Sequence, residues 1–169
     1  MANALPHAIG AQASHPGRQV VALSGDGGIA MLLGELLTLR QMQLPVKIVV
    51  FDNGALSFVE LEMKAGGIPT FGTELDNPDF AGMARAAGLY GARVDKADQL
   101  EDALTEAFIH NGPALVDVAT TRQTLSLPPK ITYSQVKGFT LYATRTILSG
   151  GGGELVELAR TNLRELDLE

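Results

Sequence analysis

The chain has 169 residues, of which 46% are hydrophobic and 19% charged, and its formal net charge is −6 at pH 7. This length and apolar content suit one globular domain. An acidic chain without clustered Lys and Arg is not expected to bind nucleic acid. The absence of cysteine excludes disulfides and thiolate catalysis, and the three histidines lack metal-ligand spacing. Without a membrane-spanning run or a signal-peptide pattern, a cytoplasmic location is expected.

Helices and strands are predicted to alternate along the first 120 residues. In chain order we expect a helix at 4–13, a strand at 18–24, a break at 25–28, a helix at 29–42, a strand at 46–51, a helix at 57–64, a loop at 66–78, a helix at 79–87, a strand at 90–94, a helix at 97–108 and a strand at 114–118. The strand at 46–51 is apolar almost throughout, as is typical of a parallel strand covered on both faces. The pattern predicts a doubly wound α/β domain with a mainly parallel sheet and helices on both faces.

The pattern changes after residue 130. Helices are expected at 134–148 and 154–166, with a glycine-rich break at 150–153. We therefore divide the chain into a main part, 1–130, and a helical C-terminal tail of the same domain, 131–169. Because a helix and a buried-type strand begin almost at the first residue, we expect the chain to be a fragment or a split subunit.

The glycine-rich run G-D-G-G at 25–28 lies where a predicted buried strand passes to a helix. Glycines let a phosphate approach the backbone, and the amides that open a helix can donate to it. Asp26 would repel that phosphate unless a cation lay between them, so it implies a metal if the ligand is a phosphate. Asn53, at the end of the next strand, offers an oxygen of the kind that Mg²⁺ binds. The alternative is a simple turn with Asp26 as a helix cap.

The G-D-G run, followed one helix and one strand later by Asp52 and Asn53, resembles the thiamine-diphosphate motif that opens with G-D-G and closes with N-N. Residues 1–11 look like the segment of that family that lies under the cofactor rings. The wider resemblance is to enzymes of the pyruvate dehydrogenase (quinone) or pyruvate oxidase type. It rests on L-P-V-K-I-V-V-F at 44–51, E-M-K-A-G-G at 62–67 and K-G-F-T-L-Y at 137–142. Asp52 departs from the first Asn of N-N, while Asn53 keeps the ligand position.

The resemblance implies a cofactor site built from two neighbouring turns. Its Mg²⁺ ligands would be Asp26, the Asn53 side chain and the Ala55 carbonyl. The other cofactor contacts would come from Met1, which would hold the cofactor bent, and from Gly25, Gly27, Gly28, Ala55 and Leu56.

Phe58 and Glu62 are four residues apart, so one helical face would present both side chains. In similar oxidases the matching positions border the substrate, which makes them the candidate catalytic residues. The alternatives are a core position for Phe58 and a solvated charge for Glu62.

The resemblance also implies what the complete enzyme does. It would decarboxylate pyruvate oxidatively to acetate and CO₂ and pass electrons through FAD to a quinone, as a homo-oligomer, with a homotetramer expected. The activating glutamate would lie on the pyrimidine-binding domain of a neighbouring subunit, and FAD largely on a middle domain. Neither fits in this chain, so the domain alone should be inactive. The alternatives are acetolactate synthase or another 2-oxoacid decarboxylase, and a non-catalytic interaction domain that retained the fold.

The last predicted helix carries an apolar face. Its members are Leu155, Val156, Leu158, Ala159, Leu163 and Leu166. Similar quinone-linked enzymes reach the membrane with an amphipathic C-terminus, which would place the protein peripherally on the inner face of the cell membrane. Acidic residues outnumber basic ones on this helix, so attraction to anionic lipid should be weak. Packing onto the domain or a partner is the favoured interpretation.

Overall fold

The computed structural model describes residues 1–122 and 132–166, with side chains up to residue 162. It divides into two compact units. The α/β unit comprises Met1–Gly54 and Leu75–Thr120, and the helical unit comprises Ala55–Glu74 and Thr121–Glu169. The boundary expected at residue 130 lies outside the described residues, and residues 55–74 group with the C-terminal helices.

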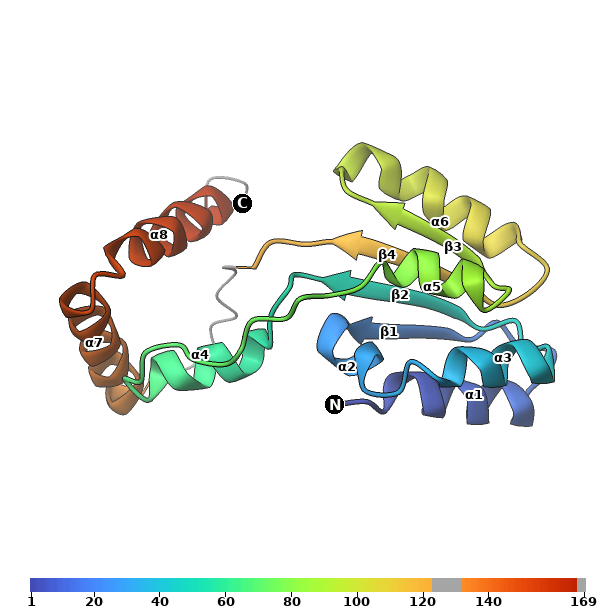
Figure 1. Ribbon diagram of the computed structural model, residues 1–169, viewed down its shortest axis with the longest axis horizontal. Helices are drawn as coiled ribbons and strands as arrows, with labels where there is room; N and C mark the ends of the chain where they lie inside the picture. The colour runs from blue at the N-terminus through green and yellow to red at the C-terminus, as the bar shows by residue number, and fades with distance from the viewer. Residues whose placement is uncertain (123–131, 167–169) are drawn as a thin grey trace. The chain divides into compact units, whose positions relative to one another are not determined.

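Four parallel strands form the sheet of the α/β unit, in the order β1-β2-β4-β3 (Figure 1). They are β1 (Val21–Gly25), β2 (Lys47–Asp52), β3 (Tyr90–Val94) and β4 (Ala114–Ala119). Their first residues are in register, since Lys47 pairs with Val21 and Ala114, and Ala114 pairs with Tyr90. The carboxyl ends of all four strands therefore meet at one edge of the sheet.

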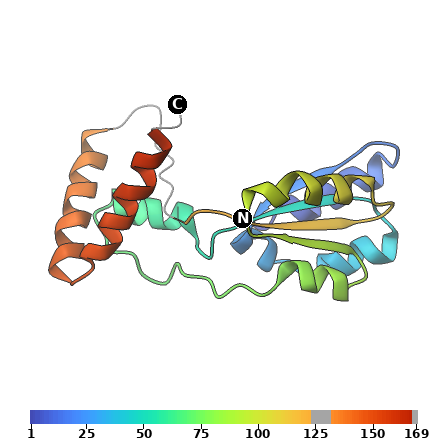
Figure 2. The same ribbon diagram turned by 90° about the horizontal axis from the view of Figure 1, so that it is seen from above.

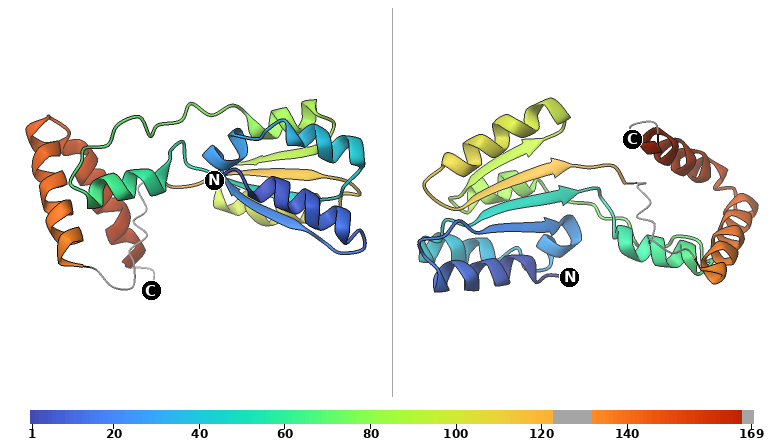
Figure 3. Two further views of the ribbon diagram at one scale, coloured as in Figure 1. Left: turned by 90° about the horizontal axis from the view of Figure 1, so that it is seen from below. Right: turned by 180° about the vertical axis from the view of Figure 1, so that it is seen from behind.

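Helices cover both faces of this sheet (Figures 2 and 3). They are α1 (Ala4–Ser14), α2 (Asp26–Ala30), α3 (Glu35–Met42), α5 (Phe80–Ala86) and α6 (Leu100–Ile109), which follows a 3₁₀ turn at Ala97–Gln99. One core joins α1, α2, α3 and α5 to the sheet face that carries Ala22, Ile48 and Leu115. A second core joins α6 to the opposite face through Ala107 and Val116. The predicted α/β class and parallel sheet are confirmed.

The helix expected at 29–42 is two helices. The first, α2, already begins at Asp26, so residues 26–28 belong to a helix and not to the expected break. Amides of residues 32, 35 and 36 then donate to carbonyls three residues earlier, which tightens the backbone between α2 and α3. This turn rotates the apolar pattern, so that Met31 is 56% exposed while Leu36 and Leu39 enter the core.

Burial was expected for the strands at 18–24 and 46–51, and it extends over consecutive residues in only one of them. Four consecutive residues of β2 are buried, as expected for a strand covered on both faces. The edge strand β1 instead alternates, with Ala22 buried and Leu23 62% exposed. Within the described residues, the second face of β1 is therefore open.

The helical unit contains α4 (Ser57–Ala65), α7 (Tyr133–Leu148) and α8 (Gly152–Leu166). A Cβ at Gly138 of α7 would lie 1.7 Å from the Ala65 carbonyl oxygen, so only glycine permits the close packing of α7 on the end of α4. In α8, Leu158 is buried and Val156 is 58% exposed. The side chains of Leu163 and Leu166 lie outside the described residues. No helix in the described ranges is long and apolar enough to cross a membrane.

Ionisable side chains are buried between these helices. Glu60 accepts hydrogen bonds from Arg122 at 2.8 Å and from Thr73 at 2.8 Å, and the Lys64 ammonium lies 3.7 Å from it. Burial alone would raise the pKa of Glu60, but the Arg122 and Thr73 hydrogen bonds and the two cations outweigh it and lower that pKa. The buried Tyr142 hydroxyl donates to Glu154 at 2.6 Å. Opposite charges are thus matched inside this unit.

Candidate functional site

Polar residues collect at the carboxyl edge of the sheet because each strand ends there. Asp26 follows β1 directly, and Asp52 ends β2 with Asn53 next to it. Asp117 lies in β4, and Arg93, its register partner, lies in β3. In open parallel sheets this edge is where ligands usually bind.

Asp26 is the most enclosed acid at the ends of β1 and β2, with 3% of its surface exposed. Its Oδ1 accepts a hydrogen bond from the Gly27 amide at 2.7 Å. Its Oδ2 accepts from the amides of Gly54 at 2.8 Å and Asn53 at 3.2 Å, and from Asn77 Nδ2 at 2.8 Å. The two turns that the sequence singled out, at 25–28 and 52–54, are therefore joined through this carboxylate.

The bonding of Asp26 leaves room for a cation on one oxygen. A carboxylate oxygen has about two lone pairs. Among the described residues, Oδ2 has three donors and is saturated, whereas Oδ1 has one donor and keeps acceptor capacity. Among the described residues, no Lys or Arg forms an ion pair with Asp26. A buried carboxylate held only by neutral donors is suited to a metal ion, and carboxylate and amide oxygens are ligands that Mg²⁺ accepts. The residues present therefore fit the predicted metal, although no group of three or more His, Cys, Asp or Glu in the described ranges is arranged to hold an ion unaided.

The glycines of this edge have separate structural roles. Gly25 caps α2 with an extended backbone, and a Cβ there would meet no other atom within 4 Å. A Cβ at Gly28 would lie 3.0 Å from the Ser24 hydroxyl oxygen, so α2 packs tightly on β1. Gly54 has φ +67°, a conformation that glycine adopts without strain, and this lets the turn after β2 present its amide to Asp26. The helix α2 has only five residues, so amide groups matter here more than a helix dipole.

The remaining predicted residues are distributed over both units. Met1, in the α/β unit, is 68% exposed. In the helical unit, Ala55 is buried and pairs with Glu74 in an antiparallel bridge, and the Leu56 amide donates to the Thr73 carbonyl at 2.8 Å. A phosphate contact from the Leu56 amide would require that bond to open. The cofactor roles of these residues stay predictions.

Phe58 and Glu62 lie on α4 in the helical unit. Phe58 is 76% exposed and Glu62 is also exposed, whereas Glu60 and Lys64 on the same helix are buried. The alternative of a core position for Phe58 does not hold within the described residues. Both side chains are available for contact with a ligand or partner, and their substrate roles stay predictions.

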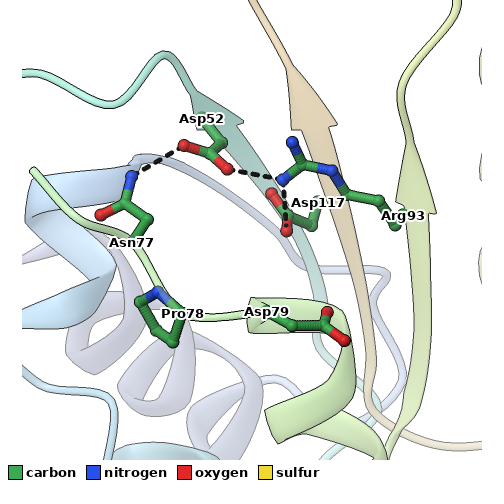
Figure 4. Close-up of a pocket in the computed structure, with 6 residues that line it drawn as sticks. All are labelled: Asp52, Asn77, Pro78, Asp79, Arg93 and Asp117. Atoms are coloured by element: carbon green, nitrogen blue, oxygen red, sulfur yellow. Dashed lines mark hydrogen bonds and ion pairs between the residues drawn. The ribbon is translucent and has the colours of Figure 1, made fainter.

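A pocket of about 330 Å³ opens at the carboxyl edge of the sheet (Figure 4), and Asn77, which donates to Asp26, is one of its lining residues. Its lining residues are Asp52, Asn77, Pro78, Asp79, Arg93 and Asp117. Arg93 Nη1 donates to Asp52 Oδ2 and, at 2.8 Å, to Asp117 Oδ2, and Asn77 Nδ2 donates to Asp52 Oδ1 at 2.7 Å. Sequence reasoning missed this group, because strand residues 93 and 117 become neighbours only through sheet pairing. The one local signal was a charged Arg in a short strand.

The charges of this group shift one another. Burial would raise the pKa of Asp52, but hydrogen bonds from Arg93 and Asn77 and the charge of Arg93 lower it overall. Burial raises the pKa of Asp117 despite its contact with Arg93, and within the described residues its buried Oδ1 has no hydrogen-bond partner. Burial opposes the charge of Arg93, but three carboxylates hold its pKa above the usual value. The positive charge of Arg93 is thus compensated by neighbouring carboxylates, so Arg93 is poorly suited to bind a phosphate.

An all-parallel α/β sheet with a buried, metal-compatible acid at its carboxyl edge defines a ligand-binding domain. Residues 1–118 match the model of the family described as "Thiamine pyrophosphate enzyme, C-terminal TPP binding domain". The chain belongs to this family, and thiamine pyrophosphate is the cofactor called thiamine diphosphate above.

Known proteins of similar sequence are several times longer than this chain. It is 36% identical over 157 residues to the "Putative thiamine pyrophosphate-containing protein YdaP" of Bacillus subtilis, which covers 93% of this chain and 27% of that protein. It is 39% identical over 117 residues to the acetolactate synthase isozyme 2 large subunit of Escherichia coli, covering 68% and 21%. It is 36% identical over 120 residues to the pyruvate oxidase of Lactiplantibacillus plantarum, covering 69% and 20%. The chain therefore spans about a quarter or less of these relatives, and their similar identities do not separate the two reaction types.

Proposed function

We propose that this domain holds the diphosphate end of thiamine diphosphate through Mg²⁺, within an enzyme that acts on pyruvate or a similar 2-oxoacid. Membership of the family supports the cofactor. The observation that carries the metal is the buried Asp26 carboxylate, which neutral donors surround and whose Oδ1 keeps acceptor capacity. When bound, the cofactor supplies the carbanion chemistry needed for decarboxylation.

In this proposal the residues of the sheet edge bind and orient, and none of them transfers a proton. Asp26 and the Asn53 side chain would bind Mg²⁺, with the Ala55 carbonyl as the third predicted ligand. The backbone at 25–28 would face the diphosphate, whose charge the metal offsets. Phe58 and Glu62 are the candidates for substrate contact, since both are exposed on α4.

For the complete enzyme we propose oxidative decarboxylation of pyruvate to acetate and CO₂, with electrons passing through FAD to a quinone. The similarity to a pyruvate oxidase supports this reaction, together with the resemblances at 44–51, 62–67 and 137–142. The proposal includes a homo-oligomer in which a neighbouring subunit supplies the pyrimidine-binding domain. It also includes a cytoplasmic location, with α8 as a candidate for contact with the membrane surface.

Acetolactate synthesis is a second candidate, because the similarity to acetolactate synthases supports it about as well. The two reactions differ in their products and in their need for an electron acceptor. The complete enzyme should be incubated with pyruvate, thiamine diphosphate, Mg²⁺, FAD and a soluble quinone, and the products identified. Acetate formed in step with quinone reduction supports the oxidase, whereas acetolactate formed without quinone reduction replaces it with the synthase.

Binding of the cofactor tests the proposal before any reaction is assigned. Isothermal titration of the complete enzyme with thiamine diphosphate should show binding that disappears when EDTA removes Mg²⁺. Asn53→Ala should weaken this binding by about tenfold or more, since loss of a metal ligand costs at least what loss of its supporting contacts costs. This variant keeps the Asn53 amide that donates to Asp26.

Asn111→Ala is the matched control, because Asn111 is exposed in a turn at the amino-terminal side of β4. It should bind the cofactor as the wild-type enzyme does. If the wild-type enzyme binds no thiamine diphosphate, or binds it equally with and without Mg²⁺, the domain has only retained the fold and the enzyme proposal fails.

A further inference from the structure

The acid at the end of β1 and the charges of β2, β3 and β4 are joined by one continuous path of hydrogen bonds. Asn77 Nδ2 donates to both Asp26 Oδ2 and Asp52 Oδ1, at 2.8 and 2.7 Å. Arg93 then joins Asp52 to Asp117 (Figure 4). The path alternates acceptor and donor across the whole carboxyl edge of the sheet.

We propose that Asn77 is a positioning residue for the metal site, and that Asp52 and Arg93 hold it in place. Asn77 is a side-chain donor to Oδ2 of Asp26, beside the Asn53 and Gly54 amides, and helps to fix the orientation in which Oδ1 is left for Mg²⁺. This inference rests on the proposed function, because it assigns a role toward the metal that Asp26 is proposed to bind.

The chemistry at position 77 requires a neutral side chain with two donor hydrogens. Both atoms that face it are carboxylate oxygens, which only accept, so the amide must turn its NH₂ group toward them. An acid at this position would be a third carboxylate beside Asp26 and Asp52. A lysine would place a cation next to Asp26 and compete with Mg²⁺. A neutral amide links the two acids without neutralising the negative charge that would attract the metal ion.

Asn77 is fixed in place by the start of α5. Two residues later, Asp79 caps this helix by accepting the Gly82 amide at 2.7 Å, and Pro78 lies between them. Proline fixes its own backbone and restricts the residue before it to extended conformations. The segment therefore presents the Asn77 side chain to the sheet edge in a defined direction.

The proposal also gives a role to Asp52, which stands where the thiamine-diphosphate motif has its first Asn. Its Oδ1 accepts from Asn77 while its Oδ2 accepts from Arg93, which is in turn held by Asp117 and Asp95. Arg93 compensates the charge of Asp52 and makes no ion pair with Asp26 among the described residues. This single arginine thus offsets part of the negative charge of Asp52, Asp95 and Asp117 and leaves that of Asp26 without an ion pair among the described residues.

The test is the Mg²⁺ concentration needed for half-maximal binding of thiamine diphosphate by the complete enzyme, measured by equilibrium dialysis. Asn77→Ala should raise this concentration about tenfold, at the lower end of the roughly 10–100-fold range typical of groups that orient metal ligands. Cofactor binding at saturating Mg²⁺ should stay close to that of the wild type. Asn111→Ala, the matched control, should leave the Mg²⁺ requirement unchanged.

A double-mutant cycle tests the link between Asp52 and Asn77. Asp52→Ala should raise the Mg²⁺ requirement, and it should add little when Asn77 is already Ala, because the two side chains act through one contact. Additive effects would show that Asp52 acts by another route and would overturn its place in the path. Should Asn77→Ala fail to fold, as judged by circular dichroism, Asn77→Ser retains one donor and should give a smaller increase.

Failure of this inference is distinguishable from failure of the proposed function. If the wild-type enzyme shows Mg²⁺-dependent binding that Asn53→Ala weakens, the metal site stands. An unchanged Mg²⁺ requirement in a folded Asn77→Ala or Asn77→Ser variant would then overturn the positioning role alone.

Discussion

Both units of this chain bury acids, and the charges of Glu60 in one unit and Asp26 in the other are compensated differently. In the helical unit, Glu60 lies 2.8 Å from the Arg122 guanidinium and 3.7 Å from the Lys64 ammonium. In the α/β unit, Asp26 accepts from three backbone amides and from the neutral amide of Asn77. A buried acid that is paired with cations of the same unit stabilises the packing of that unit. A buried acid held by neutral donors keeps a charge that a cation could still compensate, which is the basis of the metal site proposed at Asp26.

The largest expected effect tests whether packing defines the helical unit. Gly138→Ala should destabilise the contact between α4 and α7 by about 3 kcal/mol or more, because the new Cβ would collide with the backbone oxygen of Ala65. Hydrogen exchange of α4 and α7 amides in the intact protein measures the loss of protection. Gly153→Ala in α8 is the control, since no atom lies within 4 Å of its Cβ. Equal exchange in the two variants would contradict the close packing of α7 on α4.

The cofactor should stabilise the residues around Asp26 and not the residues around Glu60. Thiamine diphosphate with Mg²⁺ at about one hundred times its dissociation constant should add about 2.7 kcal/mol to the protection of amides in residues 25–30 and 52–54. At the same cofactor concentration the gain should fall to about 1.4 kcal/mol or less in Asn53→Ala and persist in Glu60→Gln. Hydrogen exchange with and without the cofactor gives both comparisons in one experiment, and an undiminished gain in Asn53→Ala would argue against the metal site.

Replacement of Glu60, the acid paired with cations, should lower the stability of the helical unit without changing Mg²⁺ binding. Glu60→Gln leaves Arg122 and Lys64 without their shared partner and should cost about 2 kcal/mol, below the figure for a fully buried pair because Arg122 is 34% exposed. Urea-dependent hydrogen exchange of α4 measures this cost. The Mg²⁺ requirement for cofactor binding should not change, and a marked change would break the separation between the two clusters.

The smallest expected effect is the contribution of Glu60 to the pH dependence of the helical unit. The folded protein lowers the pKa of Glu60 below its ordinary value of 4.5, because Arg122, Thr73 and Lys64 outweigh the effect of burial. The resulting stability is therefore fully present above that ordinary value and is lost as pH falls through the folded pKa. Protection of α4 should decline as the pH falls below about 4.5 in the wild type and less steeply in Glu60→Gln. Parallel declines would show that other groups control the acid response.

The sequence was a good guide wherever local pattern decides structure. The strand at Tyr90–Val94 was predicted with the bounds it has in the structure. The helices α4 and α7 differ from the prediction by one residue at one end, and α5 differs by one residue at each end. The single helix expected at 29–42 was wrong, because hydrogen bonds between residues three apart interrupt the α-helix between α2 and α3. Apolar spacing alone did not reveal which of Met31 and Leu36 would face the core.

The residues of the candidate site could likewise be predicted only where they belong to a local motif. The G-D-G-G run and Asn53 could be found because each is a short motif at the end of a predicted strand. Asn77, Arg93 and Asp117 could not, since each is an ordinary residue of a loop or a strand until the sheet brings it beside Asp52. The role of Gly54 also appeared only with its left-handed backbone and its contact to Asp26.

The sequence by itself determined the α/β class, the parallel sheet and the two turns of a thiamine-diphosphate motif, because periodicity and turn residues are local properties of the chain. Only the tertiary structure decided which charges are matched by ion pairs and which acid, Asp26, is held by neutral donors among the described residues. Charge compensation depends on distances between residues far apart in sequence. Parallel pairing of β1, β2, β4 and β3 sets those distances at the edge where Asp26 lies.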